Sequence, residues 1–244
     1  MTARILMHSG AAFLFGLTAC ASDGWNGEVR NWGTVWQVLG NGDTSGKVRL
    51  GDVVRPGTYG LGALEALGGE ITVFDGSAWL GRTTGPGNTP QAAIGGADEQ
   101  AALLALSRVP RWMEHRVDRS VRWEELAEFI EDIIGDAGLA GAVTVPFLVD
   151  GALHDLELHV VNGECLHRAA LDDSAAAQAP FRRTLDDATG TLVGFITNEP
   201  PGVLTHHGSR THVHVLLASP DPISAHVDRV TLAAGSVVRV PALR

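Results

Sequence analysis

The stretch "GSRTHVHVLLASPDPISAHVDRV", residues 208–230, contains two β-rich segments separated by a turn, and it carries His212, His214 and His226. Side chains alternate along a strand, so His212 and His214 share one face while Val213 lies on the other. The β-branched face is expected to pack against a core. The imidazole face is therefore expected to point toward something polar.

Two imidazoles at positions i and i+2 of a strand can converge on one ion. His226, on the next strand, supplies a third nitrogen if the strand register places it opposite. Three histidines with an open fourth position form the plan of a catalytic zinc site. Iron, nickel and copper also accept such ligands. The pattern predicts a metal site on His212, His214 and His226, with zinc favoured. His206, in the preceding loop, is interpreted as a rim residue, with a further ligand or a proton shuttle as alternatives.

The C-terminal half of the chain alternates between short apolar runs and turns, which predicts a small antiparallel sheet or barrel. The predicted strands are residues 142–149, 153–161, 191–197, 211–218, 224–232 and 236–240. The Asp150-Gly151 pair predicts a hairpin between the first two strands. The residues from 169 to 190 read as a polar, Ala-rich loop. In the strand 153–161, Asp155, Glu157 and His159 share one face, so His159 is a candidate neighbour of the metal.

The N-terminal half contains both strand and helix signals. Residues 70–83 form a clear hairpin around Asp75-Gly76, and a short helix is expected around 98–107. The strongest helix signal lies between Ser120, the expected N-cap, and Gly135 or Gly138 at its end. The acidic residues on this helix are interpreted as a solvated face.

These elements predict an α+β, β-rich fold in two domains. An N-terminal mixed sheet with helices covers residues 34–140, and a small antiparallel β-barrel that carries the metal site covers residues 141–244. Residues 21–33 read as a linker. Residues 1–20 read as a signal peptide that ends in "LTAC", which resembles the lipobox of bacterial lipoproteins. Cys20 is then a lipid anchor in the bacterial cell envelope, as a lipoprotein or a periplasmic protein. A buried N-terminal helix in a cytoplasmic protein is the alternative.

Composition limits the classes of partner. The net charge is −10, from 18 basic and 28 acidic residues, and no basic stripe is present, so nucleic acid is not an expected partner. The two cysteines, Cys20 and Cys165, exclude a disulfide framework and a thiolate zinc site. Any metal must therefore be held by histidine and carboxylate.

From about residue 34 the chain resembles the α-acetolactate decarboxylase family. The resemblance rests on "GTYGLGALEALGGEITVFDG" (57–76), "GTLVGF" (190–195) and the "THVH" and "AHVD" stretches, in this order. It implies zinc on the three histidines, Glu70 as a catalytic carboxylate and conversion of 2-acetolactate to acetoin and carbon dioxide. Zinc would polarise the hydroxyl and keto oxygens of the small 2-hydroxy-3-oxo acid, and Glu70 would deliver a proton. A homodimer is one expected assembly.

The sequence departs from the family pattern at three positions. The family has an arginine where His159 is placed, a threonine at Ala63 and a catalytic glutamate near the C-terminus, whereas this chain has no acid after Asp228. His159 and His206 are then the expected substrate-binding residues. These losses predict weak decarboxylation of 2-acetolactate. Two alternatives are another metal-dependent reaction on a small carbonyl compound, and a non-enzymatic envelope domain that binds metal or ligand in a closed site with His206 as fourth ligand.

Overall fold

The computed structural model describes residues 24–84, 89–163, 180–206, 208–218 and 222–243. The predicted signal peptide, with Cys20, and Cys165 lie outside the described residues. The strands and helices are β1 (Arg30–Trp32), η1 (Trp36–Gly40), β2 (Val48–Arg49), α1 (Leu50–Val53), β3 (Thr58–Leu64), η2 (Glu65–Leu67), β4 (Glu70–Phe74), β5 (Ser77–Arg82), β6 (Gln91–Ile94), β7 (Gln100–Arg108), β8 (Trp112–Arg116), α2 (Trp123–Asp136), β9 (Thr144–Val160), β10 (Phe181–Thr197), β11 (Thr211–Leu217), β12 (Ile223–Leu232) and β13 (Val237–Pro241).

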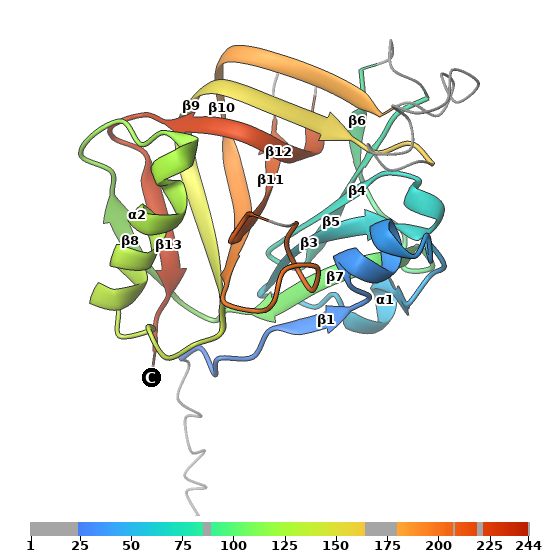
Figure 1. Ribbon diagram of the computed structural model, residues 1–244, viewed down its shortest axis with the longest axis horizontal. Coiled ribbons are helices and arrows are strands. Elements are labelled where there is room, and N and C mark those ends of the chain that lie inside the picture. Colours follow the sequence, from blue (N-terminus) through green and yellow to red (C-terminus); the bar gives the residue numbers. More distant parts are fainter. Residues whose placement is uncertain (1–23, 85–88, 164–179, 207, 219–221, 244) are drawn as a thin grey trace, which may run out of the picture.

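Two antiparallel sheets make up the fold (Figure 1). The first sheet has the strand order β1-β7-β3-β4-β5-β6, with β2 beside β7. The second has the order β10-β11-β12-β9-β13-β8, with β9 and β10 also paired. The prediction of a β-rich fold is confirmed. The expected mixed sheet is wrong, because every strand pair described in the first sheet is antiparallel. Closure of the second sheet into a barrel stays a prediction.

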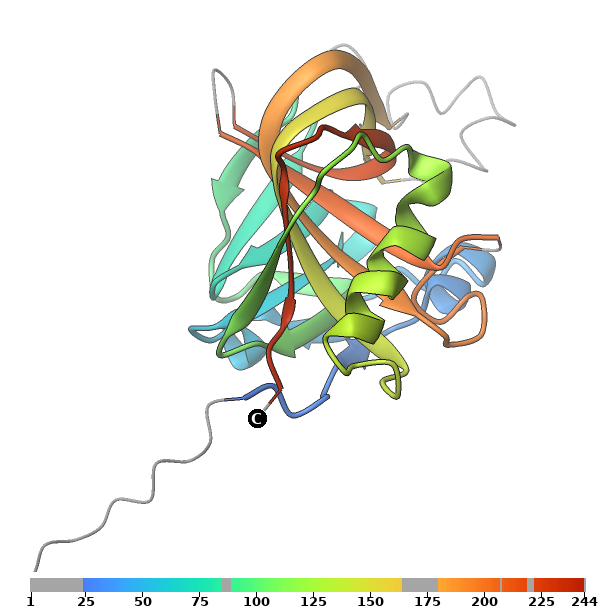
Figure 2. The ribbon, with the colours of Figure 1, turned by 90° about the vertical axis from the view of Figure 1, so that its left-hand side faces the viewer.

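The hairpin predicted at Asp150-Gly151 is wrong. β9 runs through this pair, and its two halves pair with β10 rather than with each other. Asp150 is held across the sheet, since its carboxylate accepts a hydrogen bond from the Thr191 hydroxyl at 2.5 Å. The predicted loop from 169 to 190 is likewise shorter than expected, because residues from Phe181 onward belong to β10. Figure 2 shows these two strands of the second sheet, drawn in yellow and orange, curving together at the top of the view.

The short helix expected around 98–107 is wrong as well, because these residues form most of β7. This strand lies between β1 and β3 and is buried on both faces from Ala101 to Ser107. A strand buried on both faces has no polar alternation, so its periodicity resembles that of a buried helix. The hairpin at 70–83 is confirmed as β4 and β5, whose pairing joins Phe74 to Ser77.

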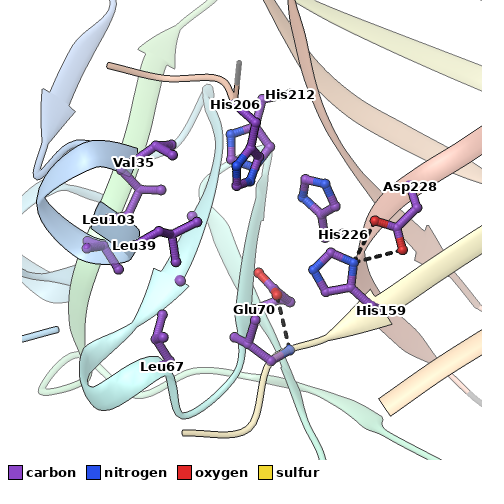
Figure 3. A pocket seen from close by; sticks show the side chains of 14 residues that line it. Val35, Leu39, Leu67, Glu70, Leu103, His159, His206, His212, His226 and Asp228 are labelled. Carbon is purple, nitrogen blue, oxygen red and sulfur yellow. Dashed lines mark hydrogen bonds and ion pairs between the residues drawn. The ribbon is translucent and has the colours of Figure 1, made fainter. Parts of the chain in front are cut away.

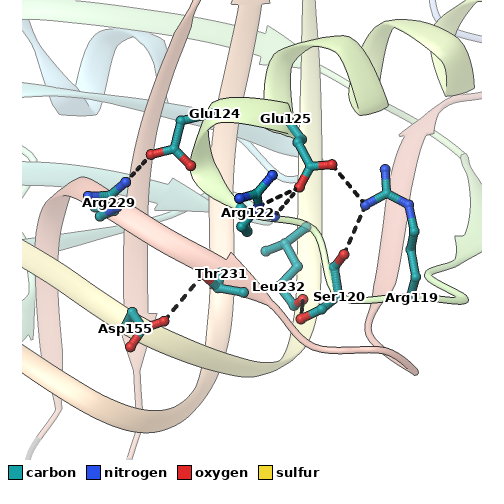
Figure 4. A network of polar contacts seen from close by, with 9 residues as sticks. All are labelled: Arg119, Ser120, Arg122, Glu124, Glu125, Asp155, Arg229, Thr231 and Leu232. Carbon is teal, nitrogen blue, oxygen red and sulfur yellow. Dashed lines mark hydrogen bonds and ion pairs between the residues drawn. The ribbon is translucent and has the colours of Figure 1, made fainter.

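The long helix is α2, and it begins later than predicted. Arg122 is the N-cap, and its backbone N–H donates to the Glu125 carboxylate, whereas the Ser120 hydroxyl donates to the carbonyl of Leu232 (Figure 4). Gly138, at φ +74°, follows the helix as predicted. The apolar stripe is buried against the second sheet, and the acidic face is paired at the surface, as between Glu124 and Arg229. None of the helices that the structure describes is long and apolar enough to cross a bilayer.

The two sheets meet where β4 and β5 pack on β11 and β12. The Thr72 hydroxyl lies 2.9 Å from the Ser224 hydroxyl. A Cβ atom at Gly81 would lie 1.7 Å from the Ser224 carbonyl oxygen, so only glycine fits at this contact. The predicted domain boundary at residue 140 stays a prediction. β8, which precedes it, is a strand of the second sheet, and α2 contacts β10 and β12 of that sheet.

Candidate metal centre and its cavity

Three histidines converge on the second sheet. His212 and His214 lie on one face of β11, and the β11–β12 register places His214 directly opposite His226. One ring nitrogen from each of the three lies within 4.8 Å of the others. The side chains of His212 and His214 are buried. The structure therefore brings together the three residues that the alternation of the strand selected, and their role as metal ligands stays a prediction.

The hydrogen bonds of these imidazoles leave nitrogens directed at the shared space. His212 Nδ1 donates to the Leu204 carbonyl at 2.9 Å, which leaves its Nε2 for another partner. His214 Nδ1 lies 3.3 Å from the Thr72 hydroxyl. Within the described residues, His214 Nε2 is buried without a hydrogen-bond partner. Buried polar atoms nearly always have a partner. A metal ion bound by the three nitrogens would provide one for His214 Nε2.

Burial keeps the three imidazoles neutral. It lowers the pKa of His212 to about 4. Burial also lowers the pKa values of His214 and His226 well below the ordinary 6.5, with a further contribution from neighbouring histidines. Neutral imidazole is the form that binds a metal. The site is therefore in its ligand form near neutral pH.

Glu70 comes from the other sheet, at the first residue of β4. Its side chain is buried, and Oε1 accepts a hydrogen bond from the Val161 backbone N–H at 3.2 Å. Oε2 lies 3.6 Å from His214 Nε2. Burial raises the pKa of Glu70 to about 7, although His159 and the Val161 N–H act in the opposite direction. The predicted catalytic carboxyl thus lies beside the three histidines.

His159 lies next to this group on β9, where it pairs with His226 in the sheet. Its ring centroid is 4.6 Å from that of His226. Its Nδ1 donates to both carboxylate oxygens of Asp228, at 2.8 and 2.9 Å. The sequence reasoning noted Asp228 only as the last acid of the chain. The signal that could have found it is its position two residues after His226 on the same strand, which places both side chains on one face.

A cavity of about 350 Å³ is lined by Glu70, His159, His212, His226 and Asp228. Figure 3 shows Glu70, His159, His226 and Asp228 facing a group of aliphatic side chains across it. His206 is exposed and also lines the cavity, and its role as a rim residue stays a prediction. Sequence reasoning missed the aliphatic side of the cavity, which consists of Val35, Val38, Leu39, Ala63, Leu67, Leu103 and Val161.

Comparisons with known proteins identify similar sequences and folds. The chain is 22% identical over 157 residues to the alpha-acetolactate decarboxylase of Bacillus subtilis strain 168, a match covering 64% of this chain and 57% of that protein. The chain thus matches a little over half the length of this curated relative.

Solved structures share the fold. The crystal structure of the Bacillus subtilis enzyme superposes with a TM-score of 0.68 at 19% identity and covers 88% of this chain and 86% of that one. A Staphylococcus aureus protein of unknown function, described as similar to alpha-acetolactate decarboxylase, gives a TM-score of 0.65 at 18% identity over 88% and 85% of the two chains. The sequence profile of the alpha-acetolactate decarboxylase family matches residues 33–240. The match spans most of the chain, and the protein therefore belongs to the alpha-acetolactate decarboxylase family.

Proposed function

We propose that this protein is a zinc-dependent carboxy-lyase that converts a small 2-hydroxy-3-oxo acid, such as 2-acetolactate, to an α-hydroxy ketone and carbon dioxide. The observation that carries the proposal is a group of three neutral imidazoles beside one buried carboxyl group, in which two of the imidazoles, His212 and His226, line the same cavity as Glu70. Membership of the family supports the reaction class.

The donor set suits zinc. His212, His214 and His226 would hold the ion through one nitrogen each, which leaves a coordination position for substrate. A zinc ion bound there would supply a Lewis acid for the hydroxyl and keto oxygens of the substrate. The His212 ring is already fixed by the Leu204 carbonyl, and such hydrogen bonds from the second ring nitrogen orient metal-binding histidines.

The remaining chemistry requires a proton. When the bond between the carboxylate carbon and its neighbour breaks, carbon dioxide leaves and the electron pair stays on the larger fragment. A proton must then be added to carbon to complete the α-hydroxy ketone. We assign delivery of this proton to the carboxyl group of Glu70, because Glu70 lines the cavity and its Oε2 lies 3.6 Å from His214 Nε2. His159, held by Asp228, presents the other side of its ring toward the same cavity and would contact the substrate.

Acetoin formation from 2-acetolactate by the purified, zinc-loaded protein tests the proposal. Glu70→Gln should retain zinc and lose about a hundredfold or more in turnover, because general acid–base groups typically contribute that much. Glu128→Gln is the matched control, since Glu128 is an exposed residue of α2. Zinc binding without decarboxylation of any 2-hydroxy-3-oxo acid would refute the assigned reaction and favour a different metal-dependent reaction at the same centre.

We also propose that the protein is anchored to the bacterial envelope through Cys20, on the basis of the "LTAC" sequence. Expression in a bacterium that lipidates its envelope proteins should place the chain in the membrane fraction. Cys20→Ser should release it from that fraction. Recovery of the parent protein from the cytosol with Met1 intact would refute the anchor.

A further inference from the structure

The cavity beside the histidines has two chemically different sides. We propose that the substrate of this protein carries an alkyl chain longer than the methyl groups of 2-acetolactate, and that this chain lies against the apolar wall of the cavity. The apolar wall is defined as Val35, Val38, Leu39, Leu67, Leu103 and Val161. This inference rests on the proposed function, because the polar end of the same substrate would lie at the metal centre.

The side chains of the apolar wall are held in fixed positions by packing. Its members come from separate parts of the chain: η1 and the residue before it, η2, β7, and the residue after β9. They nevertheless pack together in one cluster, in which Val38 and Leu67 are 2% and 4% exposed. Neighbouring side chains therefore fix their positions. Figure 3 shows Leu39 and Leu67 on the side of the cavity opposite His226 and His159.

The size of the cavity exceeds what 2-acetolactate needs. Pockets for drug-sized ligands have volumes of roughly 300–1,000 Å³, and the cavity here has about 350 Å³. A molecule as small as 2-acetolactate, bound through its oxygens at the histidines, would leave the apolar wall in contact with water. Each methylene removed from water by such a wall strengthens binding about fourfold. A longer alkyl chain would therefore gain affinity until the cavity is filled.

Ala63 lies next to both the polar and the apolar side of the cavity. It pairs with Glu70 across β3 and β4, and its side chain lines the cavity. It belongs to the same cluster as the apolar wall. A larger side chain at this position would narrow the space between the carboxyl group and the wall. Ala63 is thus the residue that we expect to set the maximum chain length.

Two measurements on the zinc-loaded full chain test the inference. The first is kcat/KM for decarboxylation of 2-hydroxy-3-oxo acids in which one methyl group is replaced by ethyl, propyl or butyl. The second is the calorimetric affinity of the corresponding α-hydroxy ketones, which requires no turnover. Both should increase about fourfold for each added methylene. Ala63→Val should reduce the values for propyl and butyl compounds more than those for methyl compounds.

Leu39→Ala removes part of the apolar wall and should flatten the dependence on chain length in both measurements. Leu243→Ala makes the same chemical change at an exposed residue outside the cavity and should leave the dependence unchanged. A flat or falling dependence in the parent protein, with turnover of 2-acetolactate intact, would overturn the inference while the proposed function stands. An increasing ketone affinity without turnover of any acid would support the apolar wall and overturn the proposed reaction.

Discussion

Glu70 should make the stability of the metal-free protein depend on pH in a direction opposite to that of most carboxyl groups. A carboxyl group in an ion pair has a lowered pKa in the folded state, whereas burial raises the pKa of Glu70 from the ordinary 4.5 to about 7. Between these values the unfolded chain releases the proton and the folded chain retains it. The contribution of Glu70 to stability is therefore complete below about pH 4.5 and is lost as the pH rises through about 7.

The expected magnitude follows from the same two values. One pH unit of displacement corresponds to about 1.4 kcal/mol, so the full effect is about 3 kcal/mol, of which about 2–3 kcal/mol develops between about pH 5 and pH 8. Glu70 is 4% exposed, so little screening by solvent is expected. Glu70→Gln keeps the shape and the hydrogen bond from Val161 and cannot ionise. The unfolding free energy of the variant, relative to that of the parent, should therefore increase by about 2–3 kcal/mol from about pH 5 to pH 8.

Urea unfolding of parent and variant, with a chelator present, measures this difference at each pH. Subtraction of the two curves cancels most of the contribution of the histidines, which both proteins share. Bound zinc should reduce the effect, because a nearby cation favours the carboxylate. A stability difference that stays constant from about pH 5 to pH 8 would show that Glu70 ionises normally in the folded protein and would refute the reasoning.

Three further variants test the metal centre and the residues beside it. Replacing both His212 and His214 by alanine should abolish binding of about one zinc per chain, and full occupancy in elemental analysis of that variant would refute the ligand assignment. Asp228→Asn removes the carboxylate that holds His159 Nδ1. It should weaken decarboxylation without unfolding the protein, and a wild-type kcat/KM would show that this hydrogen bond has no role. His159→Arg should lower the KM for the acid by adding a permanent cation, and an unchanged or higher KM would place the substrate carboxylate elsewhere.

The parts of the site that could be predicted from the sequence depend on local geometry. Alternation along a strand is a property of consecutive residues, so it placed His212 and His214 on one face. The position of His226 also followed from a short connection between neighbouring strands. The hairpin after Glu70 was visible because Asp75-Gly76 adopts the turn conformation itself, with both residues at positive φ.

The parts that could not be predicted depend on partners far away in the chain. Asp150-Gly151 has the composition of a turn, yet both halves of β9 find their partner in β10, so no turn forms. The role of Asp228 arises from a hydrogen bond to a residue on a different strand. The apolar wall combines residues that lie between Val35 and Val161 in the chain, and each of them alone reads as an ordinary core residue.

The division of the site between the sheets determines how well its geometry is maintained. The histidines belong to the second sheet and Glu70 to the first. The distance between the Glu70 carboxyl group and the histidines is therefore set by how the two sheets pack against each other. This packing depends on the close contact of the Gly81 backbone with the Ser224 backbone, which a single added methyl group would prevent. Selection for catalysis would therefore act on the absence of a side chain at a position that touches neither metal nor substrate. If β5 were displaced, the three histidines and Glu70 would all still be present, but they would lie too far apart to act on one substrate.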